Sequence, residues 1–156
     1  MLFGDGPLID DAEASASCHG SVSFRQMTQP DLEPEITEAR IGALVDAFYT
    51  KARRDPEIGP IFNAVVDDWP HHLAVLKDFW STLLLATGRY KGNPVMRHLN
   101  IGLDSAHFER WLALFAETAH EVFPPQSAAQ VIDKSRMIAR NLQDVTTMMR
   151  RSAAGE

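Results

Sequence analysis

Four side chains in this sequence combine an apolar body with a polar tip that can do chemistry. They are Tyr49, His72, His98 and Trp111. A histidine nitrogen can bind a metal ion, whereas a tyrosine hydroxyl and an indole N–H can donate hydrogen bonds. Taken one at a time, such residues are more often packed or hydrogen-bonded within a core. Because each lies on or beside the apolar face of a different expected helix, their convergence would favour a functional site.

His98 lies in an unusual setting, the segment NPVMRHLNIG at residues 93–102. Asn93 caps an expected helix and Pro94 opens it, but Asn100 and Gly102 end it within about two turns. The rest of the chain is built from long amphipathic segments, so a short helix with a histidine among apolar neighbours stands out. Residue spacing alone leaves two roles open for this histidine, a metal ligand or a core residue.

Familiar catalytic motifs are missing from the sequence. It has no glycine-rich phosphate loop, no Cys-x-x-Cys pair and no His-Glu-x-x-His motif. It also has no serine or cysteine with a credible general base at motif spacing. These classes of site are therefore not predicted.

Hydrophobic periodicity predicts the elements that must position the four side chains. Apolar residues recur at helical spacing in four long segments, and no segment shows a sustained period of two. The expected helices run from Thr37 to about residue 52, from Asp68 or Trp69 to Gly88, from Asp104 or Ser105 to Pro124, and from about Ser127 to Met149. We therefore predict an all-α fold of four long helices with one or two short ones.

Two further features of these helices are expected. The first helix ends at RRDPEIGPIF, residues 53–62, a tight elbow that turns Ile61 and Phe62 inward. The apolar face of the last helix is expected to comprise Val131, Ile138, Leu142, Val145 and Met149.

Composition and charge restrict the class of protein. The chain has 156 residues, 45% hydrophobic and 23% charged, and a formal net charge of -6, which suits one soluble domain. Scattered basic residues in an acidic chain do not favour nucleic acid or a membrane surface as partners. The longest apolar stretch, FWSTLLLA at residues 79–86, is far short of the ~20 residues that span a bilayer. With a single cysteine, Cys18, no internal disulfide is possible, and we expect a cytoplasmic location.

The chain is expected to divide into three parts. Residues 1–35 are acidic, interrupted by glycine and proline, and without a lasting period, which is typical of a mobile N-terminal arm. Residues 36–150 form the expected folded domain, and residues 151–156 form a C-terminal tail.

Several uncommon stretches resemble the group III truncated haemoglobins in both order and spacing. They are DAFYTKARRDPEIGPIF at residues 46–62, Trp69 followed by His72, DFWSTLLLATGRYKGNPVMRHL at 78–99, and HFERWLALF at 107–115. The resemblance covers residues 36–149, and the lack of Gly-Gly pairs fits group III better than groups I and II. It implies a globin-like two-over-two helical sandwich with a short proximal helix.

The resemblance also implies roles for the four side chains. His98 corresponds to the proximal ligand of the iron in haem b (iron protoporphyrin IX), with the sixth position left open for O2, NO or CO. Tyr49 and Trp111 lie over that position, and His72 lies at the gate of the distal pocket. Further contacts with the cofactor are expected from Phe62, Leu76, Tyr90 and Arg97.

Basic residues near the proximal segment are candidates for binding the haem propionates, because carboxylates need cationic or polar partners. The candidates are Arg89, Lys91 and Arg97, and an ordinary solvated surface is the alternative for each. Two other histidines, His107 and His120, are expected on the surface.

The implied function is a cytoplasmic haem protein that binds O2 tightly. Tyr49 and Trp111 can donate to the negative charge that iron-bound O2 acquires. Chemistry between nitric oxide and O2, or peroxidase-like turnover, would need electrons from an unidentified reductase. Two alternatives stay open: a helical regulatory or interaction module with a globin-like fold but no haem, and a haem-based gas or redox sensor.

Overall fold

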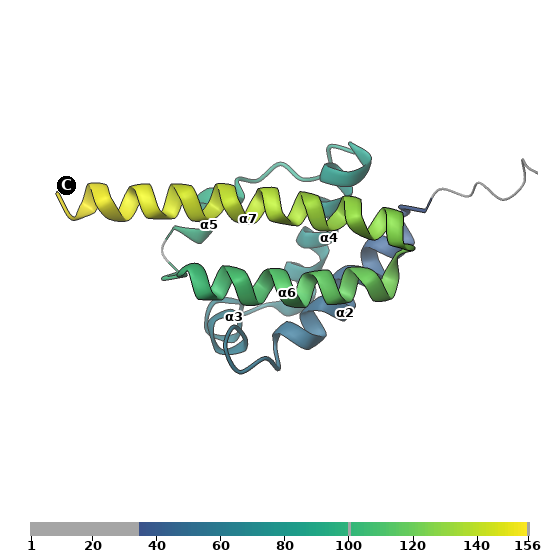
Figure 1. Ribbon diagram of the computed structural model, residues 1–156, viewed down its shortest axis with the longest axis horizontal. Helices are drawn as coiled ribbons and strands as arrows, with labels where there is room; N and C mark the ends of the chain where they lie inside the picture. Colours follow the sequence, from purple (N-terminus) through teal and green to yellow (C-terminus); the bar gives the residue numbers. More distant parts are fainter. Residues whose placement is uncertain (1–34, 100, 156) are drawn as a thin grey trace, which may run out of the picture. The chain divides into compact units, whose positions relative to one another are not determined.

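Helices make up all the regular structure in the described part of the chain, which in this computed structural model comprises residues 35–99 and 101–155 (Figure 1). They are α2 (Glu38–Ala52), α3 (Gly59–Val65), α4 (Trp69–Leu85), α5 (Pro94–His98), α6 (Ser105–Val122) and α7 (Pro125–Ala153). This confirms the prediction of an all-α fold with four long helices and two short ones. Apart from Glu35, the expected N-terminal arm lies outside the described residues. None of the described helices is long and apolar enough to cross a membrane.

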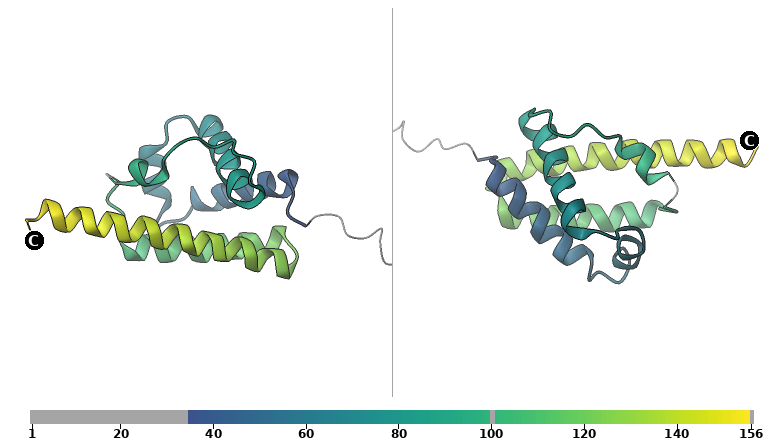
Figure 2. Two further views of the ribbon diagram at one scale, coloured as in Figure 1. Left: turned by 90° about the horizontal axis from the view of Figure 1, so that it is seen from above. Right: turned by 180° about the vertical axis from the view of Figure 1, so that it is seen from behind.

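The long helices form two layers. Helices α6 and α7 lie side by side and antiparallel, joined by the short connection at residues 123–124 (Figure 1). Helix α2 packs on α6 and on α4, and the four shorter elements lie on one side of the α6–α7 pair (Figure 2). The expected two-over-two sandwich is therefore the observed arrangement.

Side-chain caps fix where three of the long helices begin. The Thr37 hydroxyl accepts a hydrogen bond from the backbone N–H of Arg40, and the Asp68 carboxylate accepts one from that of His71. At the start of α6, Asp104 accepts from the His107 N–H while the His107 ring accepts from the Asp104 N–H, which completes a capping box. These caps satisfy N–H groups that a helix leaves unpaired, so the predicted starting points are confirmed.

Helix α2 buries one complete face, as its periodicity predicts. Its buried residues are Ile41, Leu44, Val45, Phe48, Tyr49 and Ala52, each at most 5% exposed. On the other side of the core, α6 contributes Leu114, Phe115 and Ala119. Helix α7 adds Ala128, Val131 and Ile132 to this core, and apolar residues of α3 and α4 pack against it.

Two helix ends differ from the predictions. Helix α4 ends at Leu85, before Gly88, because Ala86 already adopts a left-handed backbone with φ of 56°. Helix α7 continues to Ala153, and the prediction that Met149 lies on its buried face is wrong, since Met149 is 50% exposed. The apolar period continues there, but the last turns of α7 extend beyond the helices on which it packs (Figure 1).

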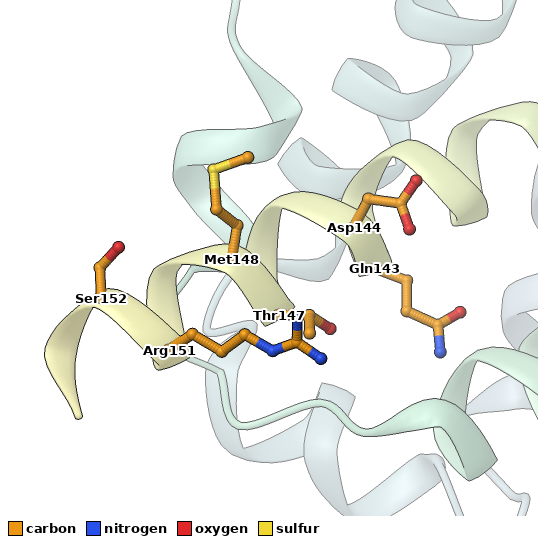
Figure 3. A pocket seen from close by; sticks show the side chains of 6 residues that line it. All are labelled: Gln143, Asp144, Thr147, Met148, Arg151 and Ser152. Atoms are coloured by element: carbon orange, nitrogen blue, oxygen red, sulfur yellow. The ribbon is translucent and has the colours of Figure 1, made fainter. Parts of the chain in front are cut away.

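The exposed face near the end of α7 contains a shallow hollow, but all of its lining comes from this one helix (Figure 3). The lining side chains are Gln143, Asp144, Thr147, Met148, Arg151 and Ser152. Most of them are polar and exposed. They form a solvated helix surface and not a site that encloses a ligand.

Gly59 lets the elbow between α2 and α3 close tightly. A Cβ at this position would lie 2.8 Å from the Arg53 carbonyl oxygen and 3.1 Å from that of Ala52. Both are backbone atoms at the end of α2, so they cannot move aside as a side chain would. We expect Gly59→Ala to lower the free energy of unfolding by about 1–3 kcal/mol, measured by urea unfolding.

Gly42→Ala is the matched control for this substitution. A Cβ at Gly42 would meet only the flexible end of Lys77, at 3.9 Å. In the middle of a helix, that change should stabilise the protein by about 0.5–1 kcal/mol. Equal stability of the two variants would contradict the steric account of the elbow.

A buried carboxylate connects the same elbow to α6. The Asp55 side chain, 3% exposed, accepts hydrogen bonds from the backbone N–H groups of Glu57 and Ile58 and lies 2.7 Å from a terminal nitrogen of Arg110. The hydrogen-bonded Arg110 guanidinium holds the pKa of Asp55 below its ordinary value, and the two backbone donors act in the same direction. Because the folded-state pKa is lowered, the ionised carboxylate stabilises the fold at neutral pH.

Asp55→Asn should therefore lower the free energy of unfolding by about 1.5–3 kcal/mol at pH 7. The difference from the wild type should shrink as the pH falls below the ordinary aspartate pKa of 3.8 and through the lower folded-state value. Urea unfolding across this pH range measures it. The control is Asp46→Asn, because Asp46 is a largely exposed partner of Lys77 and such surface pairs contribute little. A difference that stays constant down to pH 3 would show that Asp55 does not act through its charge.

Candidate functional site

A cavity of about 590 Å³ lies among the helices, large enough for a cofactor. The eight side chains expected in the distal pocket or in contact with the cofactor all line it, whereas the propionate candidates Arg89 and Lys91 do not. The eight are Tyr49, Phe62, His72, Leu76, Tyr90, Arg97, His98 and Trp111. They come from five different helices and one connecting segment, so the fold brings together residues up to about sixty positions apart.

The wall of this cavity is largely apolar. From helix α4, Trp80 lines the cavity with 2% of its surface exposed, and Leu76 and Phe79 line it and are only partly buried. Phe62 of α3 is likewise half-buried and lines it. Apolar side chains left partly uncovered around an enclosed volume indicate a ligand with a large apolar surface.

His98 reaches the cavity from α5, and its orientation is fixed by its own helix. Its ring Nδ1 lies 2.5 Å from the backbone carbonyl oxygen of Pro94, one turn earlier. A carbonyl oxygen can only accept a hydrogen bond, so Nδ1 carries the ring hydrogen and donates the bond. The lone pair of the neutral ring is then on Nε2, which is the state that a metal-ligating histidine needs.

Helix α5 is itself held in place at its start and through the segment before it. The Asn93 side chain accepts from the N–H groups of Val95 and Met96 at 3.1 and 3.4 Å. Upstream, the Tyr90 N–H donates to the Thr82 hydroxyl on α4 at 2.9 Å, and the Tyr90 ring packs edge-on against Phe79. The short helix therefore presents His98 from a segment tied to α4.

Two hydrogen-bond donors, Tyr49 of α2 and Trp111 of α6, line the cavity from other walls. Trp111 is stacked on Phe115, with ring centroids 5.0 Å apart, and meets Phe48 edge-on. Burial raises the pKa of the Tyr49 hydroxyl above its ordinary value, and the neighbouring Trp111 side chain offsets only part of this effect. Tyr49 therefore keeps its proton at neutral pH and remains a donor.

His72 of α4 packs edge-on against Tyr49, with ring centroids 5.9 Å apart. Its pKa is lowered, mainly because partial burial disfavours the imidazolium form and secondarily because His98, Arg97 and His71 are close by. His72 is therefore predominantly neutral at pH 7, with one ring nitrogen that donates and one that accepts.

The basic residues near the cavity are distributed differently from the expected set. Arg97 lines the cavity, but Arg89 forms an ion pair with Glu38 of α2 at 3.2 Å, which directs its guanidinium to another part of the fold. His71 lines the cavity although the sequence did not single it out. His107, which was expected on the surface, has a side chain that is 26% exposed, and it also caps α6 and lines the cavity. Its position three residues after Asp104 is a capping-box spacing, with histidine where glutamate is usual.

The residues around this cavity fit a haem group. The volume and apolar wall suit a porphyrin, Nε2 of His98 is available as the one protein ligand of its iron, and Arg97 is available to its carboxylates. The helix arrangement and this cavity together are those of a globin of the two-over-two class.

Comparisons with known proteins identify the family. No protein-family model matches the sequence. Over 115 residues the chain is 33% identical to the group 3 truncated hemoglobin ctb of Campylobacter jejuni, covering 70% of this chain and 91% of that protein. The crystal structure of the group III truncated hemoglobin from Campylobacter jejuni matches with a TM-score of 0.68, covering 73% of this chain and 94% of that one at 33% identity. The chain belongs to the group III truncated haemoglobins, which makes it a globin-type haem protein.

A more distant likeness agrees with this fold. The group II truncated hemoglobin from Bacillus anthracis matches with a TM-score of 0.62 at 24% identity, covering 69% of this chain and 85% of that one. At this identity the match shows the shared fold alone.

Proposed function

We propose that the protein holds haem b in the cavity through His98 and binds O2, NO or CO there. The observation that carries this proposal is the His98 ring, whose Nδ1 donates to the Pro94 carbonyl so that Nε2 is free to bind iron. Haem iron bound by a single histidine supplies one open coordination position for a diatomic gas. Phe62, Leu76 and Tyr90 pack against the porphyrin, and Arg97 binds a propionate.

Tyr49 and Trp111 make the binding of O2 tight. Both donate a hydrogen bond toward the open position, and the indole N–H can only donate. The apolar residues around them exclude water, and in such surroundings a fixed donor stabilises developing negative charge more than it would in water. His72, neutral at pH 7, gates the entry of ligands to these donors.

The proposed physiological reaction is the oxidation of nitric oxide by O2, with peroxidase-like turnover as a second use of the same site. Nitric oxide oxidation requires a reductase to return the protein to the ferrous state, whereas peroxidase-like turnover requires an electron-donating substrate. The single cysteine of the sequence is consistent with a reducing, cytoplasmic location.

One spectroscopic experiment tests the proposed function. The purified protein is titrated with haemin, reduced with dithionite and exposed to CO, and an absorption spectrum is recorded at each step. We expect one haemin per chain, a five-coordinate ferrous spectrum, and a shift of that spectrum when CO binds. A chain that folds but takes up no haemin in stoichiometric amount would be a haem-free member of the fold, and the proposal would be rejected.

A further inference from the structure

Trp69, the first residue of α4, contacts the rings of Tyr49 and His72, two of the polar side chains that line the cavity. Its ring centroid lies 5.9 Å from that of Tyr49 and 5.6 Å from that of His72. The Tyr49 and His72 rings are themselves 5.9 Å apart. The three rings therefore form a closed triangle of aromatic contacts, two of them edge-on.

Trp69 is not among the described residues that line the cavity, so its place in the triangle is outside the cavity wall. A ring in that position restricts the other two. His72 cannot swing away from the cavity without losing its edge contact with Trp69, and Tyr49 cannot tilt without disturbing the same indole. The orientation of both polar tips is thus coupled to Trp69.

Arg53 holds Trp69 in turn. The guanidinium carbon of Arg53 lies 4.3 Å from the centroid of the indole ring, which is a cation–π contact. Arg53 is well placed for this role because its backbone is fixed at the end of α2. Its N–H donates to the Tyr49 carbonyl at 3.1 Å, and its own carbonyl accepts from the Asn63 side chain at 3.1 Å.

We propose that Trp69 is a positioning residue for Tyr49 and His72, and that Arg53 fixes Trp69 from the solvent side. Trp69 and Arg53 together determine how well the Tyr49 hydroxyl is oriented toward a bound gas and how readily His72 leaves the entrance of the cavity. This inference rests on the proposed function, because it concerns the hydrogen bond to the gas and the gate to the cavity.

Variants of both residues test the proposal in the haem-loaded full chain. Trp69→Leu removes the aromatic ring and Trp69→Phe keeps one. Arg53→Gln removes the cation, and Arg54→Gln is its matched control at an adjacent exposed position. The readouts are the infrared stretching band of bound CO, which reports hydrogen-bond donors near the ligand, the O2 dissociation rate, the CO association rate and the thermal midpoint.

We expect Trp69→Leu to broaden or split the CO band and to raise the O2 dissociation rate by roughly 3- to 10-fold, a fraction of the loss expected when the hydroxyl itself is removed. It should also speed CO association. Trp69→Phe should recover most of the wild-type behaviour. Arg53→Gln should shift the CO band and both rates in the same direction as Trp69→Leu but less, and Arg54→Gln should leave the band and both rates unchanged.

A double variant separates positioning from simple support of the fold. If Trp69 acts on O2 through the Tyr49 hydroxyl, Trp69→Leu should change O2 dissociation far less in a Tyr49→Phe background than in the wild type. A lowered thermal midpoint with an unchanged CO band and unchanged rates would overturn the proposal, and so would equal rate effects in both backgrounds. If Trp69→Leu does not fold, Arg53→Gln still decides the matter, because it alters only an exposed side chain.

The proposed function can fail separately from this inference. A wild-type chain that binds no haemin would remove the proposed function, and a Tyr49→Phe variant with unchanged O2 dissociation would remove its tight binding of O2. Wild-type haem binding and a strong Tyr49→Phe effect, combined with no effect at Trp69 or Arg53, would remove only the positioning role.

Discussion

His98→Ala is expected to abolish stable haem retention and the five-coordinate ferrous spectrum. The imidazole is held by the Pro94 carbonyl with Nε2 free, and alanine offers no donor atom in its place. The other residues of α5 supply no replacement, since Met96, the remaining side chain with a soft donor atom, is 61% exposed. Haemin titration and the reduced and CO-bound absorption spectra measure the loss.

Two controls distinguish loss of a ligand from loss of the fold. His120→Ala removes the same type of side chain from an exposed position on α6 and should leave the spectra unchanged. Free imidazole added to His98→Ala should restore part of the haem binding, because the cavity is otherwise intact. Ferrous and CO-bound spectra of His98→Ala that match the wild type would show that another residue binds the iron.

Tyr49→Phe is expected to raise the O2 dissociation rate by roughly 10- to 150-fold, which corresponds to losing one charge-assisted hydrogen bond of about 1.5–3 kcal/mol. The substitution keeps the ring, and hence the contacts of Tyr49 with Phe48 and Phe62, and removes only the hydroxyl. CO is the internal control, because bound CO carries less charge and should dissociate at nearly the wild-type rate. Stopped-flow measurements of both gases provide the comparison.

Trp111→Phe should act in the same direction, but it is a less clean test. Trp111 is stacked on Phe115 and meets Phe48, so a smaller ring also leaves space in the wall. Because both donors would serve one bound ligand, the effects of the two substitutions should not add, and the double variant should reveal a coupling term. Small and equal changes in the O2 and CO dissociation rates would show that Tyr49 is a packing residue.

The sequence predicts the helices well because three of the four long helices have a capping residue at their start, whereas α7, which has no side-chain cap, begins at Pro125 and not at the predicted Ser127. Thr37, Asp68 and Asp104 cap the helices at the expected positions. The apolar period of one helix cannot show where the neighbouring helices end. It therefore assigned Met149 to a buried face, although α7 extends there beyond the helices on which it packs. Local patterns thus describe an element, and tertiary contacts decide how much of it is covered.

The candidate site could be predicted from the sequence less completely than the helices. The short helix around His98 is visible from residues 93–102 alone, but the convergence of Tyr49, His72 and Trp111 on it came from resemblance to a family and not from spacing. The side chain that holds Arg89, Glu38, is distant in sequence, and no local pattern indicates that pairing. Similarly, the contact of Trp69 with Arg53 joins the first residue of α4 to the residue that follows α2, so only the folded chain shows it.

The partner of His98 Nδ1 also bears on which chemistry the site favours. A backbone carbonyl is a neutral acceptor, so it draws the ring hydrogen less strongly than a carboxylate would, and the proposed ligand would be an imidazole rather than an imidazolate. Strong electron donation from an anionic axial ligand is what promotes cleavage of an O–O bond. The Pro94 carbonyl supplies no such charge. With His98 as the proposed ligand, this neutral partner therefore favours holding bound O2 over heterolytic, peroxidase-like cleavage of an O–O bond.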